Sequence, residues 1–186
     1  MNHQPIRPVT RAVTTALVAA GMMAATMPAA QAGDGDDRKG TTRVAVAPAV
    51  VSKLDRLGLE AAPTKGATAV PFEGTVALRF PVTAVKNDGN KLKHKGGVRI
   101  SSGHEAIALK RFTVKLGKSK VGAAVSVNGD KVGRVEVLNI RKSNRPALGD
   151  VRLTLTRTAA KAINATFGAP AFSAGDNFGF AKVRLR

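Results

Sequence analysis

The sequence contains no cysteine, which excludes thiol catalysis, cysteine-ligated metal centres and disulfide bonds. It also lacks tryptophan and tyrosine, so its large aromatic side chains are seven phenylalanines. Proteins that bind single-stranded nucleic acid usually offer aromatic platforms on which bases stack, so we expect no specific nucleic-acid partner. Acidic residues are also few: 12 Asp and Glu face 30 Lys and Arg, a net charge of +18.

The chain begins with a short basic segment carrying Arg7 and Arg11, followed by an uncharged, apolar run over 12–29. This run ends in Ala-Gln-Ala, the small-x-small pattern accepted by signal peptidase, with cleavage expected between Ala32 and Gly33. A membrane anchor is the alternative, but Thr, Gly and Pro dilute a run that is barely long enough to span a bilayer. We therefore predict a cleavable signal peptide and a secreted or cell-wall-associated protein, with no transmembrane segment.

The predicted organisation has three parts: a signal peptide over 1–32, a disordered tail over 33–45 and a single β-rich domain over 46–186. The tail is polar and rich in glycine, a composition typical of disorder. Removing 32 of the 186 residues leaves 154, which suits one domain with its own core. The leader takes two arginines with it, so the net charge falls only from +18 to about +16.

From residue 72 onward, apolar side chains alternate with polar ones, a period that predicts strands with one buried and one wet face. Asn128-Gly129 predicts a tight hairpin, and a shift of phase at Leu138 predicts a bulge. Two short helices are predicted over 48–57 and 156–167, while 61–71 is predicted as loop or edge strand. The expected fold is mainly β: an antiparallel sandwich or barrel-like sheet of about seven or eight strands.

After the predicted leader, the sequence contains few residues suited to catalysis. His94 and His104 are the only histidines there, and no nucleophile-elbow motif or carboxylate pair accompanies them. Two histidines without cysteine make a poor metal site, so we predict no metal and expect both side chains to be solvated. A non-enzymatic binding protein is the main hypothesis, and a hydrolase is kept as an alternative.

The candidate ligand-binding residues form two basic clusters: Lys91, Lys93, His94, Lys95 and Arg99, and then Arg141, Lys142 and Arg145. A third basic stretch runs over 110–120, across a strand and its turn. Anionic cell-wall or extracellular polymers are the expected partners, because cations spread along a chain attract polyanions. The alternative is that these side chains only keep the protein soluble and protect strand edges.

Two stretches carry a resemblance to known proteins. The first is the histidine-glycine-glycine strand of 94–101 with the strand 107–116, and the second comprises Leu153–Ala160, Asn164, Phe167-Gly168, Phe172 and Gly175. Over roughly 46–185 the chain resembles uncharacterised secreted actinobacterial β-rich proteins. These in turn distantly resemble the haem-transport-associated domain.

The resemblance implies a secreted β-rich module that binds haem at the cell surface. In that family the haem site relies on a tyrosine ligand, and this chain has no tyrosine. No cofactor is therefore the main prediction. A haem or small-ligand carrier using His94, the one residue near a family-like position, is the alternative.

Overall fold

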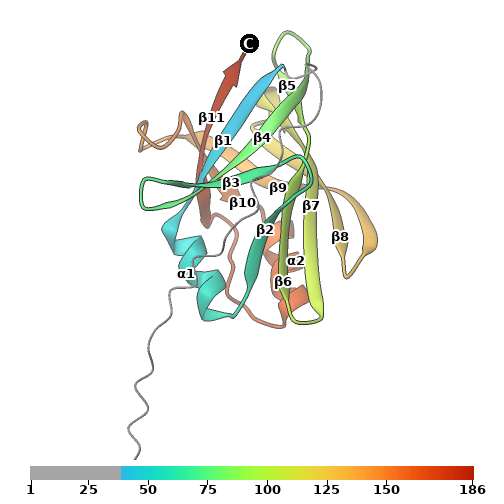
Figure 1. The fold of residues 1–186 in the computed structure, drawn as a ribbon. Coiled ribbons are helices and arrows are strands. Elements are labelled where there is room, and N and C mark those ends of the chain that lie inside the picture. The colour runs from blue at the N-terminus through green and yellow to red at the C-terminus, as the bar shows by residue number, and fades with distance from the viewer. Residues whose placement is uncertain (1–38) are drawn as a thin grey trace, which may run out of the picture. The chain divides into compact units, whose positions relative to one another are not determined.

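The computed structural model describes residues 39–186 (Figure 1), so the predicted signal peptide, its cleavage site and the first part of the predicted tail lie outside the described residues. The elements are β1 (Gly40–Val46), α1 (Pro48–Arg56), β2 (Glu60–Thr64), β3 (Thr68–Phe72), β4 (Thr75–Lys86), β5 (Lys91–His94), β6 (Gly97–Ser102), β7 (Glu105–Lys115), β8 (Lys120–Val127), β9 (Asp130–Lys142), β10 (Val151–Leu155), α2 (Arg157–Phe167) and β11 (Asn177–Leu185). A single 3-10 turn, Leu116–Lys118, joins β7 to β8.

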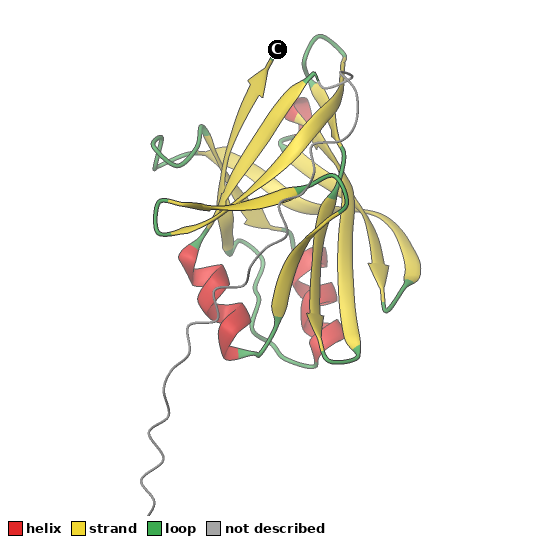
Figure 2. Cartoon of the chain, in the orientation of Figure 1, coloured by secondary structure: helices red, strands yellow, loops and turns green. Residues whose placement is uncertain are grey.

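Eight strands close into an antiparallel barrel in the order β7-β5-β4-β1-β11-β10-β9-β8, with β8 pairing back onto β7. The other three strands extend it: β6 pairs with the first half of β7, β2 pairs with β6, and β3 pairs with β4. Figure 2 shows these strands in yellow, with both helices at the lower end of the view. The mainly β prediction is confirmed, in its barrel form. Within residues 39–186, no helix is both long and apolar enough to cross a membrane.

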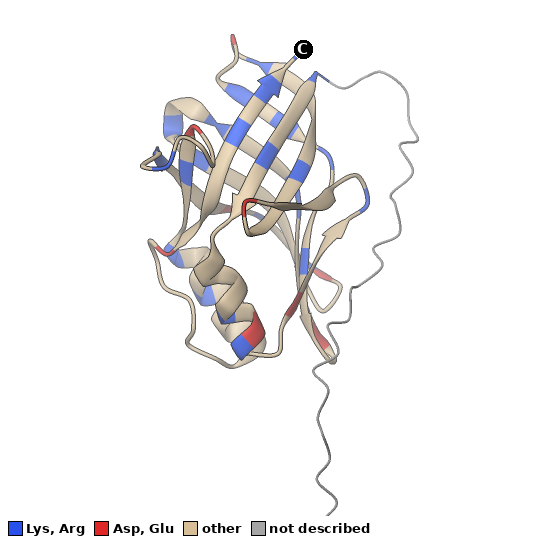
Figure 3. Ribbon diagram, turned by 60° about the vertical axis from the view of Figure 1, so that its left-hand side comes forward, with Lys and Arg blue, Asp and Glu red and all other residues tan. Residues whose placement is uncertain are grey.

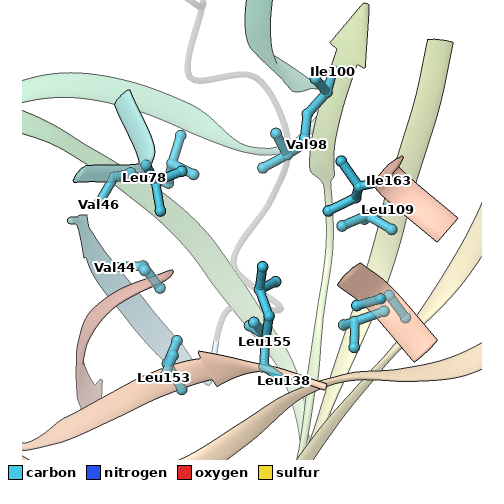
Figure 4. Packing of buried hydrophobic residues seen from close by; sticks show 14 of the residues in the cluster. Val44, Val46, Leu78, Val98, Ile100, Leu109, Leu138, Leu153, Leu155 and Ile163 are labelled. Atoms are coloured by element: carbon cyan, nitrogen blue, oxygen red, sulfur yellow. The ribbon is translucent and has the colours of Figure 1, made fainter. Parts of the chain in front are cut away.

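The core is built from alternate residues of the barrel strands together with one face of each helix (Figure 4). Val44, Leu78, Leu138 and Leu153 come from four strands of the barrel, and Ile163 comes from α2. Each is 8% exposed or less. Burial of side chains of this size stabilises the fold by roughly 1.5–3 kcal/mol each.

The predicted local signals are confirmed. α1 begins at Pro48, and the Thr156 hydroxyl caps α2 by accepting from the Ala159 amide at 3.1 Å. Asn128 and Gly129 both adopt positive φ, 51° and 97°, as their tight turn requires. The shift of phase at Leu138 is a bulge, because Val121 faces Leu138 while Gly122 faces Glu136, so one β9 residue is left over.

Strand β1 is the main difference from the sequence prediction. Residues 40–45, which we assigned to a disordered tail, form a strand between β4 and β11. Thr42 and Val44 point into the core and are each 5% exposed. The polar composition of this segment is typical of a tail, so the sequence did not predict the strand. In the barrel, β4 and β11 satisfy its backbone on both sides, and a threonine occupies one of its buried positions.

Candidate functional site

His94 lies at the end of β5, directly opposite Val82 of β4. Leu92 and His94 share the inner face of β5, and they are 3% and 5% exposed. The expectation of a solvated His94 is therefore wrong: the alternation that places Leu92 in the core places His94 there as well. His104 lies on the exposed turn between β6 and β7.

Both ring nitrogens of His94 have partners. Nδ1 lies 3.3 Å from the carbonyl oxygen of Phe112, and Nε2 lies 2.7 Å from the hydroxyl oxygen of Thr42. A carbonyl can only accept, so Nδ1 carries the proton and donates it to Phe112. Nε2 is then the acceptor, and the Thr42 hydroxyl donates to it. The tautomer thus follows from the partners.

Burial fixes the charge of this imidazole. Removal from water lowers the pKa of His94 from 6.5 to about 4, although the hydrogen bond to Phe112 raises it in part. At neutral pH the ring is therefore uncharged. A neutral imidazole with its Nδ1–H held by a carbonyl is the form in which histidine binds metals.

A groove of about 640 Å³ adjoins His94. We call it the basic groove, and its lining residues are Thr83, Lys91, Lys93, His94, Arg111, Thr113, Lys115, Gly122, Arg134, Val135 and Glu136. They come from strands β4, β5, β7, β8 and β9. Five side chains in this set are cationic and one is acidic, so the groove favours an anionic ligand.

A bulge in β7 shapes the groove. The pairing of β7 with β8 shifts between Lys110 and Thr113, and Arg111 takes a positive φ of 52°. The Arg134 guanidinium donates to the Thr113 hydroxyl at 2.7 Å and to the Arg111 carbonyl at 3.1 Å. These two hydrogen bonds hold the bulge and fix Arg134 across it.

The cations of the groove differ in their pairing. The Lys115 ammonium lies 3.3 Å from the Glu136 carboxylate, an exposed ion pair worth little. Lys91, Lys93 and Arg111 have no ion-pair partner among residues 39–186. These three positive charges are available to a ligand.

The structure brings together only some of the predicted site residues. Lys91, Lys93 and His94 line the basic groove. The other predicted residues do not line it: Lys95 in the β5–β6 connection, Arg99 on β6, Arg141 and Lys142 at the end of β9, and Arg145 in the β9–β10 loop. Sequence reasoning missed Thr42 and Arg134, and it noted Arg111 only as part of the basic stretch over 110–120.

In the described part of the chain, the surroundings of His94 supply neither a catalytic triad nor a cluster of metal-ligating side chains. His94 has no carboxylate partner, which a catalytic triad would require. Across residues 39–186, no three His, Cys, Asp or Glu side chains are placed to hold a metal ion together. The functional groups of this region are therefore the neutral imidazole of His94 and the cations of the basic groove.

No protein-family model matches the sequence, and no curated protein matches it. The barrel does have structural relatives. The chain is similar in fold to the C-terminal domain of HtaA from Corynebacterium glutamicum. The TM-score is 0.52 at 14% identity, over 77% of this chain and 94% of the HtaA domain.

A second solved structure, the haem-binding protein HtaB from the same organism, aligns with a TM-score of 0.49 at 14% identity. The alignment covers 79% of this chain and 95% of HtaB. The fold of the HtaA domain agrees with the distant resemblance to the haem-transport-associated domain. At this identity the HtaA similarity establishes the fold and nothing finer.

Proposed function

We propose that this protein is an exported, non-enzymatic haem carrier in which His94 Nε2 is the iron ligand. The observation that carries the proposal is the state of His94: buried, uncharged at neutral pH, and held by the Phe112 carbonyl through Nδ1. The resemblance to the haem-transport-associated domain supports the choice of ligand. The predicted signal peptide supports a place of action outside the cytoplasm.

The residues present fit a haem group in their donor chemistry. Haem iron accepts an imidazole nitrogen, and a histidine whose other nitrogen donates to a carbonyl is fixed in the tautomer that leaves Nε2 free of hydrogen. The low pKa of His94, about 4, means that protons do not compete with iron at neutral pH. When bound, the haem would supply a Lewis-acidic iron and two carboxylates.

Thr42 controls access to this nitrogen. Its hydroxyl donates to Nε2 at 2.7 Å, so the lone pair is engaged by a hydrogen bond. Rotating the threonine side chain would free Nε2 at the cost of one hydrogen bond, roughly 1 kcal/mol. A threonine hydroxyl is itself a poor iron ligand, which leaves the imidazole as the donor of this pair.

The cations of the basic groove suit the carboxylates of haem in charge. By strand alternation Lys91 and Lys93 lie on the face of β5 opposite to the His94 ring, so a bound haem would have to reach past the end of the strand to use both. Lys91, Lys93 and Arg111 have no ion-pair partner within the described chain, and Arg111 can form two parallel hydrogen bonds to a carboxylate. A volume of about 640 Å³ lies within the range of small-molecule sites. Imidazole ligation would distinguish this protein from the tyrosine-ligated family that it resembles.

A haem titration of the purified secreted chain tests the proposal. We expect a Soret shift that saturates at one equivalent and is lost in His94→Ala, because the iron then has no ligand. His104→Ala is the matched control and keeps the shift, since His104 lies on an exposed turn. Thr42→Val removes the competing hydroxyl at similar size, so it should bind haem at least as tightly.

Circular dichroism must show that His94→Ala remains folded. The absence of any Soret shift in the parent protein would reject haem as the ligand. An unchanged shift in folded His94→Ala would reject His94 as the iron ligand.

A further inference from the structure

On the outside of the barrel, strand register places cations side by side. Arg43 of β1 lies directly opposite Arg79 of β4 on one side and Lys182 of β11 on the other. Figure 3 shows Lys and Arg bands on neighbouring strands of this part of the barrel. Like charges directly opposite each other in a sheet are destabilising. A row of three in register therefore needs an explanation beyond folding.

The same face continues around the barrel. Arg184 follows Lys182 by two residues and so points to the same side of β11. Arg152 of β10 lies opposite Arg141 of β9. We define the cationic face by these side chains: Arg43, Arg79, Arg141, Arg152, Lys182 and Arg184.

Few groups of the protein neutralise this face. The Lys182 ammonium lies 3.6 Å from the Asp150 carboxylate, and the two side chains are 38% and 59% exposed, so the pair is weak. Arg79, Arg141, Arg152 and Arg184 have no ion pair with any residue of 39–186. Among residues 39–186, Asp150 is thus the one acidic residue that forms an ion pair with any of these six cations.

Two of these arginines are partly buried, and Arg43 is held in place by its contacts. The Arg43 guanidinium lies 3.9 Å from the centre of the Phe72 ring, and its Nη2 donates to the Leu148 carbonyl at 3.4 Å. The Nε atoms of Arg43 and Arg152 are buried without a hydrogen-bond partner. Half-buried, fixed guanidinium groups bind an anion with less loss of side-chain entropy than free lysines do.

We propose that the cationic face binds a flexible polyol phosphate polymer, in which phosphodiester groups repeat without nucleobases. Five of its six cations are arginines, whose planar fork matches phosphate oxygens. The face extends over five adjacent strands, from β4 to β9, which is about 19 Å at the usual strand spacing. That width exceeds a single phosphate and suits several in succession.

The face has no surface on which bases could stack. Phe180 lies between Arg152 and Ala45 in the register but is only 4% exposed, and one face of Phe72 is covered by Arg43. A nucleic acid would lack the aromatic platforms on which single strands depend. A polyol phosphate polymer needs only charge and hydrogen bonds, and both are present.

This surface is separate from the proposed haem site. Thr42 points into the barrel toward His94, whereas Arg43, the next residue of β1, points outward. The two proposals can therefore fail independently. A haem-binding result says nothing about polymer binding.

Binding of a purified poly(glycerol phosphate) of defined length to the secreted chain, measured at several salt concentrations, tests the inference. Arg79→Gln, Arg141→Gln and Arg184→Gln are combined because all three side chains are exposed and their loss should leave the fold intact. The matched control removes three charges elsewhere, with Lys118→Gln, Lys131→Gln and Lys161→Gln. The control should keep the affinity within about twofold.

We expect the arginine variant to bind at least tenfold more weakly at low salt. The slope of log affinity against log salt should also fall by about two, because each phosphate contact on a flexible chain contributes about 0.7. An equal loss in the lysine control would show that net charge alone acts and would overturn the site. No binding by the parent protein at low salt would overturn the proposal. So would tighter binding of poly-dT or polyglutamate at matched charge.

Discussion

The side chain of His94 donates to a carbonyl and accepts from a hydroxyl inside the barrel. A second proton on the ring would convert Nε2 from acceptor to donor, and the Thr42 hydroxyl would then have to turn and accept from it. It would also place a charge where 5% of the residue is exposed. At the residue scale, the fold therefore selects the neutral imidazole, which the proposed iron ligation requires.

This selection predicts how stability depends on pH. The pKa of His94 is lowered to about 4 in the folded state and is 6.5 when unfolded, so the unfolded state binds the proton more tightly. His94 therefore costs nothing above pH 6.5, and stability is lost as the pH falls toward 4. The loss is about 3 kcal/mol over this window, at roughly 1.4 kcal/mol per pKa unit. Urea unfolding at pH 7.5 and pH 4 measures it.

His94→Asn provides the comparison, because asparagine does not titrate and the carboxylates that also titrate here are common to both proteins. The parent should lose about 3 kcal/mol more than this variant between the two pH values. His104→Asn should behave like the parent. Identical pH dependence of the parent and His94→Asn would contradict the burial argument.

At the element scale, Thr156 joins a helix to the barrel. Its hydroxyl oxygen accepts from the Ala159 amide and donates to the Glu136 carbonyl at 2.8 Å, so one side chain both caps α2 and ties it to β9. Ala159, Ala160 and Ile163 then lie on the buried face of the helix. The N-terminal cap of α2 and its attachment to β9 therefore both depend on the Thr156 hydroxyl.

Thr156→Ala should lower the free energy of unfolding by about 1–2 kcal/mol, because it leaves the Ala159 amide and the Glu136 carbonyl without their partner. Thr156→Ser keeps the hydroxyl and should lose less than about 0.5 kcal/mol. Chemical denaturation of both variants measures the difference. Equal losses would mean that the methyl group, rather than the two hydrogen bonds, carries the effect.

Elements whose signals lie in residues close together in the sequence were predictable. The cap at Thr156, the turn at Asn128-Gly129 and the alternation along β4 are each fixed by residues close in sequence, so the pattern contained what the structure needed. Strand β1 was not predictable in this way. The polar, glycine-rich stretch that runs into it favours a tail, and its strand pairing is with β4 and β11, whose residues are about 40 and 140 positions away.

The candidate site was predictable only in part, for the same reason. Lys91, Lys93 and His94 are neighbours on one strand, so the local cluster of basic residues in the sequence was enough to predict them. Arg134 reaches the groove by bonding across the β7 bulge to Arg111, 23 residues earlier, and no local pattern contains that contact. The burial of His94 likewise depends on closure of the barrel, which joins β7 to β8 and β1 to β11.

The whole molecule places constraints on where the chain can be cut. β1 is a member of the closed ring, paired on both edges, so a cut within it would open the barrel between β4 and β11. The predicted cleavage between Ala32 and Gly33 lies seven residues before Gly40, where β1 begins. Processing there would leave every strand of the barrel intact.

We therefore predict that the chain is exported and that its mature form begins at Gly33, which intact-mass measurement of the protein from culture medium would show. Ala32→Lys should block processing, because signal peptidase requires a small residue directly before the cut. Gln31→Lys adds the same charge one position earlier, where larger residues are tolerated, and should be processed normally. A mature chain beginning within β1, or normal processing of Ala32→Lys, would refute the assignment. The first result would also conflict with the closed barrel, since the strand between β4 and β11 would be lost.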